Sequence, residues 1–224
     1  MDQVKPFHYE CHEYGNIQNS VDYFLKCKVD KAQKILDIGT NIGSFPYELH
    51  TLGYERIFGI DIRTTAIEHG QSRYAPIRDN LSCYDGMNIP FGDKSFDVIT
   101  MFDVIEHISK ISEFLKEVNR VLAPNGRLVF QTPNIYINSV WSTIVWRSFA
   151  WREEHCSLQS LGSLNRLLAN AGFQQIVIEK QSINTEFNRS EVRNQLGSIG
   201  PLLLKAADIL PLVLFPNFYG SATK

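Results

Sequence analysis

The sequence has few cysteines, little excess charge and no long hydrophobic run. Its 224 residues include four cysteines (Cys11, Cys27, Cys83 and Cys156), none of which forms a Cys-x-x-Cys pair with another. This pattern argues against a zinc knuckle or a disulfide framework and is typical of a reducing compartment. Lysine and arginine number 22 against 24 acidic residues. The chain therefore lacks the basic excess of a dedicated nucleic-acid-binding protein, and we expect no nucleic-acid partner.

No segment of the sequence has the features of a signal peptide or a membrane span. The first 15 residues, MDQVKPFHYECHEYG, contain no apolar run, so we expect no secretory signal. The most apolar stretch, Pro201–Phe215, is interrupted by Lys205, Asp208 and Pro211. It is shorter than the roughly 18 residues that a membrane span needs. These absences predict a cytoplasmic chain.

From about residue 31 onward, short apolar runs alternate with segments of helical periodicity. Buried strands are predicted at Lys34–Ile38, Arg56–Ile60, Phe96–Met101, Arg127–Gln131 and Gln175–Lys180. Such alternation is typical of an α/β fold with a mostly parallel sheet and helices on both faces. We expect a Rossmann-like, doubly wound core over 31–180, an N-terminal arm or lid over 1–30, and an apolar C-terminal appendage over 181–224.

The most informative segment follows the first predicted strand: Leu36-Asp-Ile-Gly-Thr-Asn-Ile-Gly-Ser-Phe45. Glycines at this point let the backbone turn tightly and approach a ligand at a helix N-terminus. Taken alone, the pair Gly39 and Gly43 is also consistent with a turn that serves packing. The second strand ends at Asp61, about 22 residues beyond Gly39, where dinucleotide-binding folds place an acidic residue that binds a ribose.

A second candidate binding segment, Asp85-Gly86-Met87, precedes the third strong predicted strand. The Asp85 carboxylate and the neighbouring backbone amide would recognise the edge of an adenine, with Met87 or Ile62 packing on the ring. The alternative is that Asp85 only stabilises a turn.

These segments, taken in order, resemble the successive motifs of class I S-adenosylmethionine-dependent methyltransferases, in particular the small-molecule branch (types 11, 12 and 23). The resemblance covers about residues 31–180. Its motifs are Asp37-x-Gly39-x-x-x-Gly43, Gly59-Ile-Asp61, Asp85-Gly-Met-Asn-Ile-Pro-Phe91, Ser95-Phe-Asp-Val-Ile99, Phe102-Asp-Val-Ile-Glu-His107, Arg120-Val-Leu-Ala-Pro-Asn-Gly126 and Gln131-Thr-Pro-Asn134.

The resemblance implies S-adenosylmethionine as cofactor and S-adenosylhomocysteine as product. It implies that the methionine end of the cofactor contacts Asp37, Gly39 and Gly43. It further implies ribose binding by Asp61, adenine binding by Asp85 and Gly86, and a place beside the cofactor for Phe102. Asn41 stands where the family usually has a third glycine, and asparagine tolerates the left-handed backbone that such a turn requires.

The family's sheet has seven strands and ends with an antiparallel strand. Only Asn217–Lys224 remains for it, so we expect that strand to be short, displaced or absent.

Two histidines are candidate catalytic residues. His107 follows the third strong strand, near the place where the resemblance puts the methyl group, and is the first candidate general base. The alternative is that Glu106 and His107 cap a helix or brace the loop. His155 precedes a late helix and is a second candidate that would face the acceptor. We expect no metal site, because the His-x-x-x-His pair of His8 and His12 lacks the Glu of a zinc motif.

The acceptor is expected to be a small molecule bound by segments outside the cofactor-binding half. These are an insertion over 135–157, which holds all three tryptophans, and the apolar stretch 201–215. The resemblance of the Thr-Pro-Asn segment to the small-molecule branch, together with the apolar stretch, favours a sugar or glycan acceptor, and quinone-like or lipidic acceptors come next. The apolar stretch packs on the core or on a second copy in a homodimer, or it contacts a lipid-linked acceptor or a membrane surface.

Two other functions share this layout. An NAD-dependent oxidoreductase also has a strand, a glycine loop, a helix and an acidic residue, but Gly39-x-x-x-Gly43 lacks the Gly-x-Gly-x-x-Gly spacing. A Tyr-x-x-x-Lys pair is also missing downstream. A non-catalytic binding module that retains the fold is the second alternative, and its support is Asn41 and the undecided base.

Overall fold

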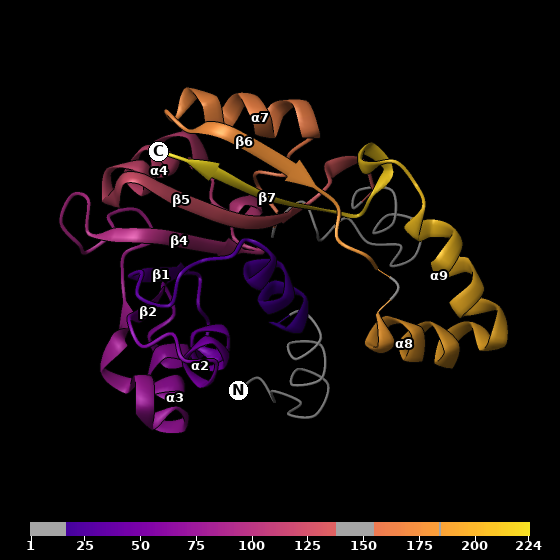
Figure 1. Ribbon diagram of the computed structural model, residues 1–224, viewed down its shortest axis with the longest axis horizontal. Helices are drawn as coiled ribbons and strands as arrows, with labels where there is room; N and C mark the ends of the chain where they lie inside the picture. Colours follow the sequence, from indigo (N-terminus) through magenta and orange to yellow (C-terminus); the bar gives the residue numbers. More distant parts are fainter. Residues whose placement is uncertain (1–16, 138–154, 184) are drawn as a thin grey trace.

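The computed structural model describes residues 17–137, 155–183 and 185–224. A seven-stranded sheet with the order β3-β2-β1-β4-β5-β7-β6 organises this part of the chain (Figure 1). Its strands are β1 (Ile35–Ile38), β2 (Ile57–Asp61), β3 (Leu81–Cys83), β4 (Phe96–Phe102), β5 (Leu122–Pro133), β6 (Gln174–Glu179) and β7 (Asn217–Thr223). β7 runs antiparallel to β5 and β6, and the other pairs are parallel.

Helices cover both faces of the sheet. The α-helices are α2 (Ser44–Thr51), α3 (Thr64–Arg73), α4 (Ile111–Val121), α7 (Leu161–Asn170), α8 (Glu186–Leu196) and α9 (Gly200–Asp208), and residues 17–26 are also helical. Short 3-10 helices lie at η1 (Ala75–Asn80), η2 (Ile105–His107), η3 (Gly197–Ile199) and η4 (Leu212–Leu214). The Rossmann-like, mostly parallel fold predicted from the sequence is confirmed.

Alternate residues of the central strands pack into two separate cores. Leu36 and Ile99 belong to the core beneath α4 and α7. Their neighbours Ile35 and Val98 belong to the core beneath α2 and the helix over 17–26. Successive side chains of a strand point to opposite faces, so an almost wholly apolar strand can supply both layers. This burial explains why the central strands were recognisable as continuous apolar runs.

The last strand is present and fully paired, which resolves the expectation that it is short, displaced or absent. β7 occupies the position between β5 and β6 over seven residues. Its Phe218 is buried in one core and Tyr219 in the other. The predicted appendage over 181–224 therefore includes a strand of the core sheet. In the same way, the predicted arm over 1–30 includes the buried residues Tyr23 and Phe24.

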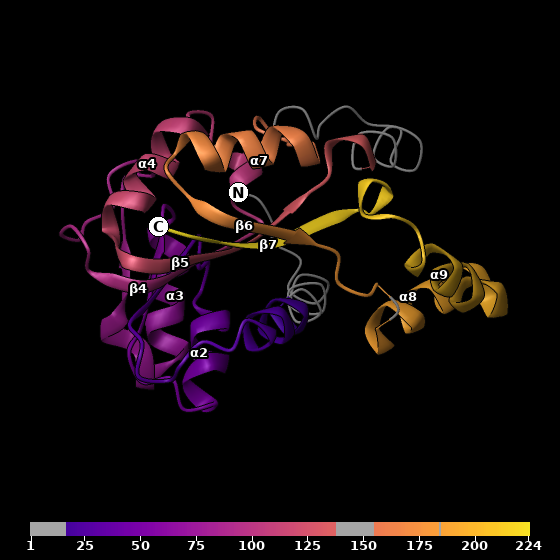
Figure 2. The same ribbon diagram turned by 45° about the horizontal axis from the view of Figure 1, so that its top comes forward.

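The remaining C-terminal helices extend away from the sheet. α8 and α9 pack against each other and project beyond the end of β6 (Figures 1 and 2). Lys180 Nζ anchors the base of this helical hairpin by donating to the carbonyls of Asp208 and Leu210, at 2.7 and 2.8 Å. Within the described part of the chain, no helix is long and apolar enough to cross a membrane.

The sheet order places a topological switch point between β1 and β4. The chain proceeds from β1 to β2 and β3 on one side, then returns to β4 and β5 on the other. Open α/β sheets bind ligands outside the carboxyl ends of the strands at such a point. The loops after β1, β2 and β4 therefore meet where a site is expected.

Candidate active site

A cavity of about 930 Å³ lies at the carboxyl ends of β1, β2 and β4. Of the predicted site residues, those that line it are Asp37, Gly39, Asn41, Asp61, Ile62, Asp85, Gly86, Met87, Phe102 and His107. Gly43 and His155 are not in its wall. The residues nominated by separate motifs thus come together around one space.

The glycine loop after β1 has the tight, left-handed turns that its sequence predicts. Gly39 has a φ of 76°, and its N–H donates to the carbonyl of Ile60 at 2.8 Å. A Cβ on Gly39 would collide with the side chain of Val104. Asn41 takes the left-handed conformation as well, with a φ of 54°, so the asparagine preserves the turn despite the missing glycine.

Gly43 has a packing role. It precedes α2 with a φ of 83°, and a Cβ there would lie 2.8 Å from a methyl group of Leu81. Any larger residue would push the start of α2 away from β3. Gly43 therefore shapes the loop from behind the cavity wall.

Asp61 joins the glycine loop to the end of β2. Its Oδ2 accepts the N–H of Asn41 at 2.8 Å, and its Oδ1 accepts the N–H and the Nε of Arg63 at 2.9 and 3.2 Å. A carboxylate has about four lone-pair sites, so capacity remains for hydroxyl donors from the cavity. This is the chemistry that ribose binding requires.

Asp37 is a buried carboxylate at the end of β1. The hydroxyl of Thr100 donates to its Oδ1 at 2.6 Å. Burial raises the pKa of Asp37 to about 7. A cationic ligand group beside Asp37 would offset the free-energy cost of ionising this buried carboxyl group. The site therefore favours a cationic ligand group.

Asp85 stabilises its own turn, the alternative that the sequence left open. Its Oδ1 accepts the N–H groups of Met87 and Asn88 at 2.8 and 2.6 Å, and Oδ2 accepts Asn88 Nδ2 at 2.6 Å. These hydrogen bonds hold the pKa of Asp85 below its usual value. Met87 of this turn and Ile62, which is 61% exposed, both line the cavity. Two apolar side chains beside a polar turn suit an adenine ring.

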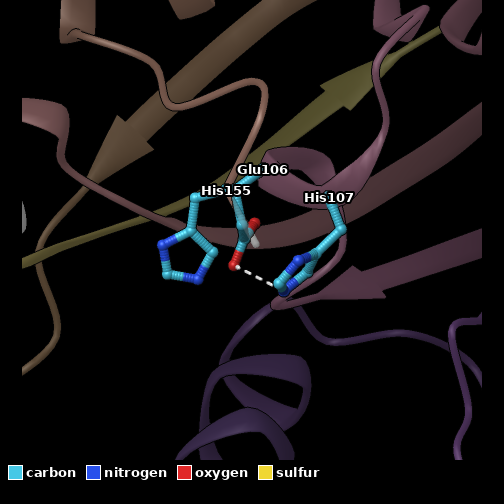
Figure 3. A group of neighbouring side chains, drawn as sticks. All are labelled: Glu106, His107 and His155. Carbon is cyan, nitrogen blue, oxygen red and sulfur yellow. Dashed lines mark ion pairs between the residues drawn. The ribbon is translucent and has the colours of Figure 1, made fainter. Parts of the chain in front are cut away.

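The two predicted catalytic histidines lie side by side, and the carboxylate of Glu106 lies between their rings (Figure 3). The ring centroids of His107 and His155 are 5.0 Å apart, and His107 Nε2 is 3.9 Å from Glu106 Oε1. The backbone N–H of Ser157 donates to the carbonyl of Glu106 at 2.9 Å, which fixes the loop of His155 beside η2.

Glu106 itself was not nominated from the sequence. Its side chain is buried, and Oε2 accepts the hydroxyl of Thr132 at 3.0 Å. Burial and the neighbouring Asp103 carboxylate raise the pKa of Glu106 to about 8. The only sequence feature that marked Glu106 was its position between β4 and His107. A single glutamate in that motif does not indicate that its side chain is buried.

Asp103 is a second residue that sequence reasoning missed. It lines the cavity just after β4 with a φ of 53°. Gln131 holds it from β5, since Asp103 N–H donates to Gln131 Oε1 at 2.9 Å and Gln131 Nε2 donates to Asp103 Oδ1 at 2.8 Å. A left-handed aspartate fixed by a buried glutamine is the kind of backbone strain that gathers at functional sites.

Some predicted features lie outside the described residues. They are His8 and His12, and the three tryptophans of the 135–157 insertion.

Comparison with known proteins decides the family. A model of a methyltransferase domain matches residues 10–178, which is more than half of the chain. The chain belongs to this methyltransferase family. The resemblance to the methyltransferase family and the Rossmann-like fold inferred from the motifs are thus confirmed.

Individual relatives agree with this assignment. The chain is 35% identical over 121 residues to a ubiquinone/menaquinone biosynthesis C-methyltransferase of Geotalea daltonii, covering 50% of this chain and 52% of that protein. It is 29% identical over 150 residues to a probable S-adenosylmethionine-dependent methyltransferase of Mycobacterium tuberculosis, covering 66% of this chain and 51% of that one. The chain thus spans about half the length of these curated relatives.

A solved structure shows the same fold. It is a Thermotoga maritima S-adenosylmethionine-dependent methyltransferase described as a possible histamine N-methyltransferase, with a TM-score of 0.66 and 18% identity. The match covers 93% of this chain and 89% of that one. At this identity the likeness establishes the fold, and the acceptor has to be argued from the site.

Proposed function

We propose that this methyltransferase transfers a methyl group to an oxygen or nitrogen of a small acceptor, with a sugar or glycan as the favoured class. The observation that carries the proposal is the cavity that runs from Asp61 and Asp85 to Phe102 and His107. One end has the groups that a nucleoside requires. The other end has ionisable side chains that suit a reacting acceptor.

At the cofactor end, each residue would bind a different part of S-adenosylmethionine. Asp61 would accept the ribose hydroxyls, while Ile62 and Met87 would cover the adenine. Asp37 would attract the ammonium group of the methionine portion. Gly39 lets the loop that lines the cavity pack against Val104, because a Cβ at this position would collide with that side chain.

At the acceptor end, the protein has to position a nucleophile and remove its proton. When bound, S-adenosylmethionine would supply an electrophilic methyl group on a sulfonium, and the acceptor would supply the electron pair for the new bond. His107 is half-exposed in the cavity wall and would take the acceptor proton. Glu106 and His155 would orient it. Positioning would supply much of the remaining rate enhancement.

The Thr-Pro-Asn motif supports a glycan carried on a lipid. Thr132 holds Glu106, and Asn134 Nδ2 donates to the carbonyls of Val213 and Phe215, both at 2.9 Å. The motif therefore connects the acceptor end to the apolar C-terminal segment. Exposed apolar side chains of that segment, which would contact a lipid chain, are Leu202, Leu203, Ile209, Leu210, Val213 and Leu214.

A transfer assay tests the proposal. Purified protein would be incubated with S-adenosylmethionine carrying a labelled methyl group and with three acceptor sets: free sugars, lipid-linked glycans, and quinone precursors. We expect label in the glycan sets and none in protein heated before the assay. Label only in the quinone set would contradict the glycan assignment. Stoichiometric cofactor binding without transfer to any acceptor would favour a non-catalytic module.

A further inference from the structure

We propose that Glu106, His107 and His155 form a binding site for a zinc-type divalent cation at the acceptor end of the cavity. One ligand atom from each residue lies within 4.8 Å of the others. Figure 3 shows both imidazole rings beside the Glu106 carboxylate. The His-x-x-x-His spacing in the sequence belongs to His8 and His12, whereas this cluster is assembled by the fold.

The donor set suits such a cation. Two imidazoles and one carboxylate are the protein ligands of several catalytic zinc sites, and three protein ligands leave a fourth position for water or substrate. Imidazole nitrogen also binds Fe²⁺, Ni²⁺ and Cu²⁺, whereas magnesium and calcium prefer oxygen ligands. The cluster is therefore expected to favour Zn²⁺ or Co²⁺ over Mg²⁺.

Neighbouring groups hold the ligands in place. Thr132 donates to Glu106 Oε2, which leaves Oε1 on the side of His107. The hydrogen bond from Ser157 N–H to the Glu106 carbonyl fixes the segment that carries His155. Metal ligands in proteins are usually oriented by such outer hydrogen bonds. Both contacts come from chain segments remote from η2, so the cluster depends on tertiary structure.

A modest rearrangement would complete the coordination. Ligand atoms around a tetrahedral zinc with bonds of about 2.0–2.1 Å lie roughly 3.3 Å apart. His107 Nε2 lies 3.9 Å from Glu106 Oε1, and the His107 side chain is 47% exposed. A small rotation of that side chain shortens the gap without disturbing the core.

A cation here would have a role in the reaction, and this part of the inference rests on the proposed function. His107 lines the cavity that the acceptor would enter. A bound divalent cation lowers the pKa of a hydroxyl group that approaches it, so with the metal bound His107 would serve as a ligand in place of its role as the base. The site therefore points to an oxygen acceptor, such as a sugar hydroxyl, rather than a nitrogen.

Direct metal binding is the test. Chelator-treated protein would be dialysed against buffered Zn²⁺, with Mg²⁺ in parallel, and bound metal counted per chain. S-adenosylhomocysteine binding to the same sample would be measured by calorimetry. We expect one Zn²⁺ per chain, no Mg²⁺ at the same free concentration, and cofactor binding with or without the metal.

Variants locate the metal. His107→Ala and His155→Ala should each weaken Zn²⁺ binding by about 100-fold or more, and Thr132→Val by about 10- to 100-fold, the usual effect of losing an outer-shell partner. His69→Ala, an exposed histidine on α3, is the matched control and should leave binding unchanged. The double variant His8→Ala/His12→Ala controls for the N-terminal pair.

The outcomes are distinct. The proposal is overturned if the protein binds cofactor but no Zn²⁺, or if Zn²⁺ binding survives His107→Ala and His155→Ala and is lost with His8 and His12. In the first case the three side chains serve as an acid–base group, and the proposed methyl transfer stands. Failure to bind S-adenosylhomocysteine would count against the proposed function, whatever the metal result.

Discussion

At the residue scale, three aspartates at neighbouring positions of one cavity have different properties. Asp37 is buried and its pKa is raised, whereas the exposed Asp85 has a lowered pKa because its own turn donates to it. Asp61 fixes a loop through three hydrogen bonds. Burial and hydrogen bonding thus separate the roles of chemically identical side chains.

Asp61 is expected to contribute most of the ribose affinity. Asp61→Ala should weaken S-adenosylhomocysteine binding by about 1–3 kcal/mol, the usual loss when a charged hydrogen-bond acceptor is removed. Isothermal titration would measure it, with circular dichroism to confirm folding. Asp79→Ala, at an exposed site in η1, is the control. Equal affinity in a folded Asp61→Ala protein would remove Asp61 from the site.

Asp37 should make the empty protein less stable as the pH rises from about 4 to about 7. The pKa of Asp37 is about 7 in the folded chain, against 3.8 for an ordinary aspartate. In that window the unfolded chain releases the proton while the folded chain keeps it, which favours unfolding. Asp37→Asn keeps an oxygen acceptor for Thr100 and removes the titration. In denaturant unfolding, the free energy of unfolding of Asp37→Asn relative to that of the parent protein should increase as the pH rises over this range. A difference between the two proteins that does not change with pH would refute the assignment.

At the element scale, the loop after β1 depends on the helical turn after β4. Gly39 faces Val104, which precedes η2, so the glycine loop and the acceptor end are packed against each other. A substitution in one loop is therefore expected to disturb the other.

Gly39→Ala tests this coupling. The left-handed φ and the collision with Val104 should lower the free energy of unfolding by about 1–3 kcal/mol and weaken cofactor binding. Gly162→Ala in α7 is the matched control, because a Cβ there meets nothing within 4 Å. Denaturant unfolding would compare the two. Equal stability of both variants would contradict the packing described for Gly39.

Much of the fold could be predicted because local sequence and tertiary structure agree. The strands ending at Ile38, Asp61 and Phe102 are apolar on both faces, and the loop of Gly39 carries its own backbone signal. β3 was missed because three residues at the sheet edge make too short a pattern. β7 was uncertain because its sequence, Asn-Phe-Tyr-Gly-Ser-Ala-Thr, has no clear period.

The acceptor end was only partly predictable. His107 and His155 were nominated separately from their places after a strand and before a helix. Their contact depends on the hydrogen bond between Ser157 and Glu106, which joins segments far apart in the chain. Neither hydrophobic periodicity nor motif spacing encodes such a contact, so Glu106 and the cluster emerged from the fold.

At the scale of the whole molecule, a Rossmann-like core carries a projecting hairpin of α8 and α9 (Figure 2). The hairpin exposes leucines and isoleucines at its surface, with Leu202 68% exposed and Ile209 82% exposed. Exposed apolar surface of this kind marks an interaction site. The segment that follows the hairpin is hydrogen-bonded to Asn134. We therefore associate the apolar surface of the hairpin with the acceptor end of the cavity.

Charging this surface should separate lipid recognition from catalysis. Leu202→Asp/Ile209→Asp should leave the fold and S-adenosylhomocysteine binding intact, because both side chains are exposed. It should reduce methylation of a lipid-linked glycan, and vesicle co-sedimentation, more than methylation of the free sugar. Conversion of a dimer to a monomer by the same changes, seen by light scattering with lipid binding unaffected, would instead assign the surface to self-association.

The central claim is that the cavity binds S-adenosylmethionine through the residues named by the motifs. Calorimetric titration of dialysed protein with S-adenosylhomocysteine, with NAD in parallel, tests it most directly. We predict micromolar binding of the first at one site per chain and no binding of NAD. Binding of neither ligand, or of NAD alone, would contradict the account.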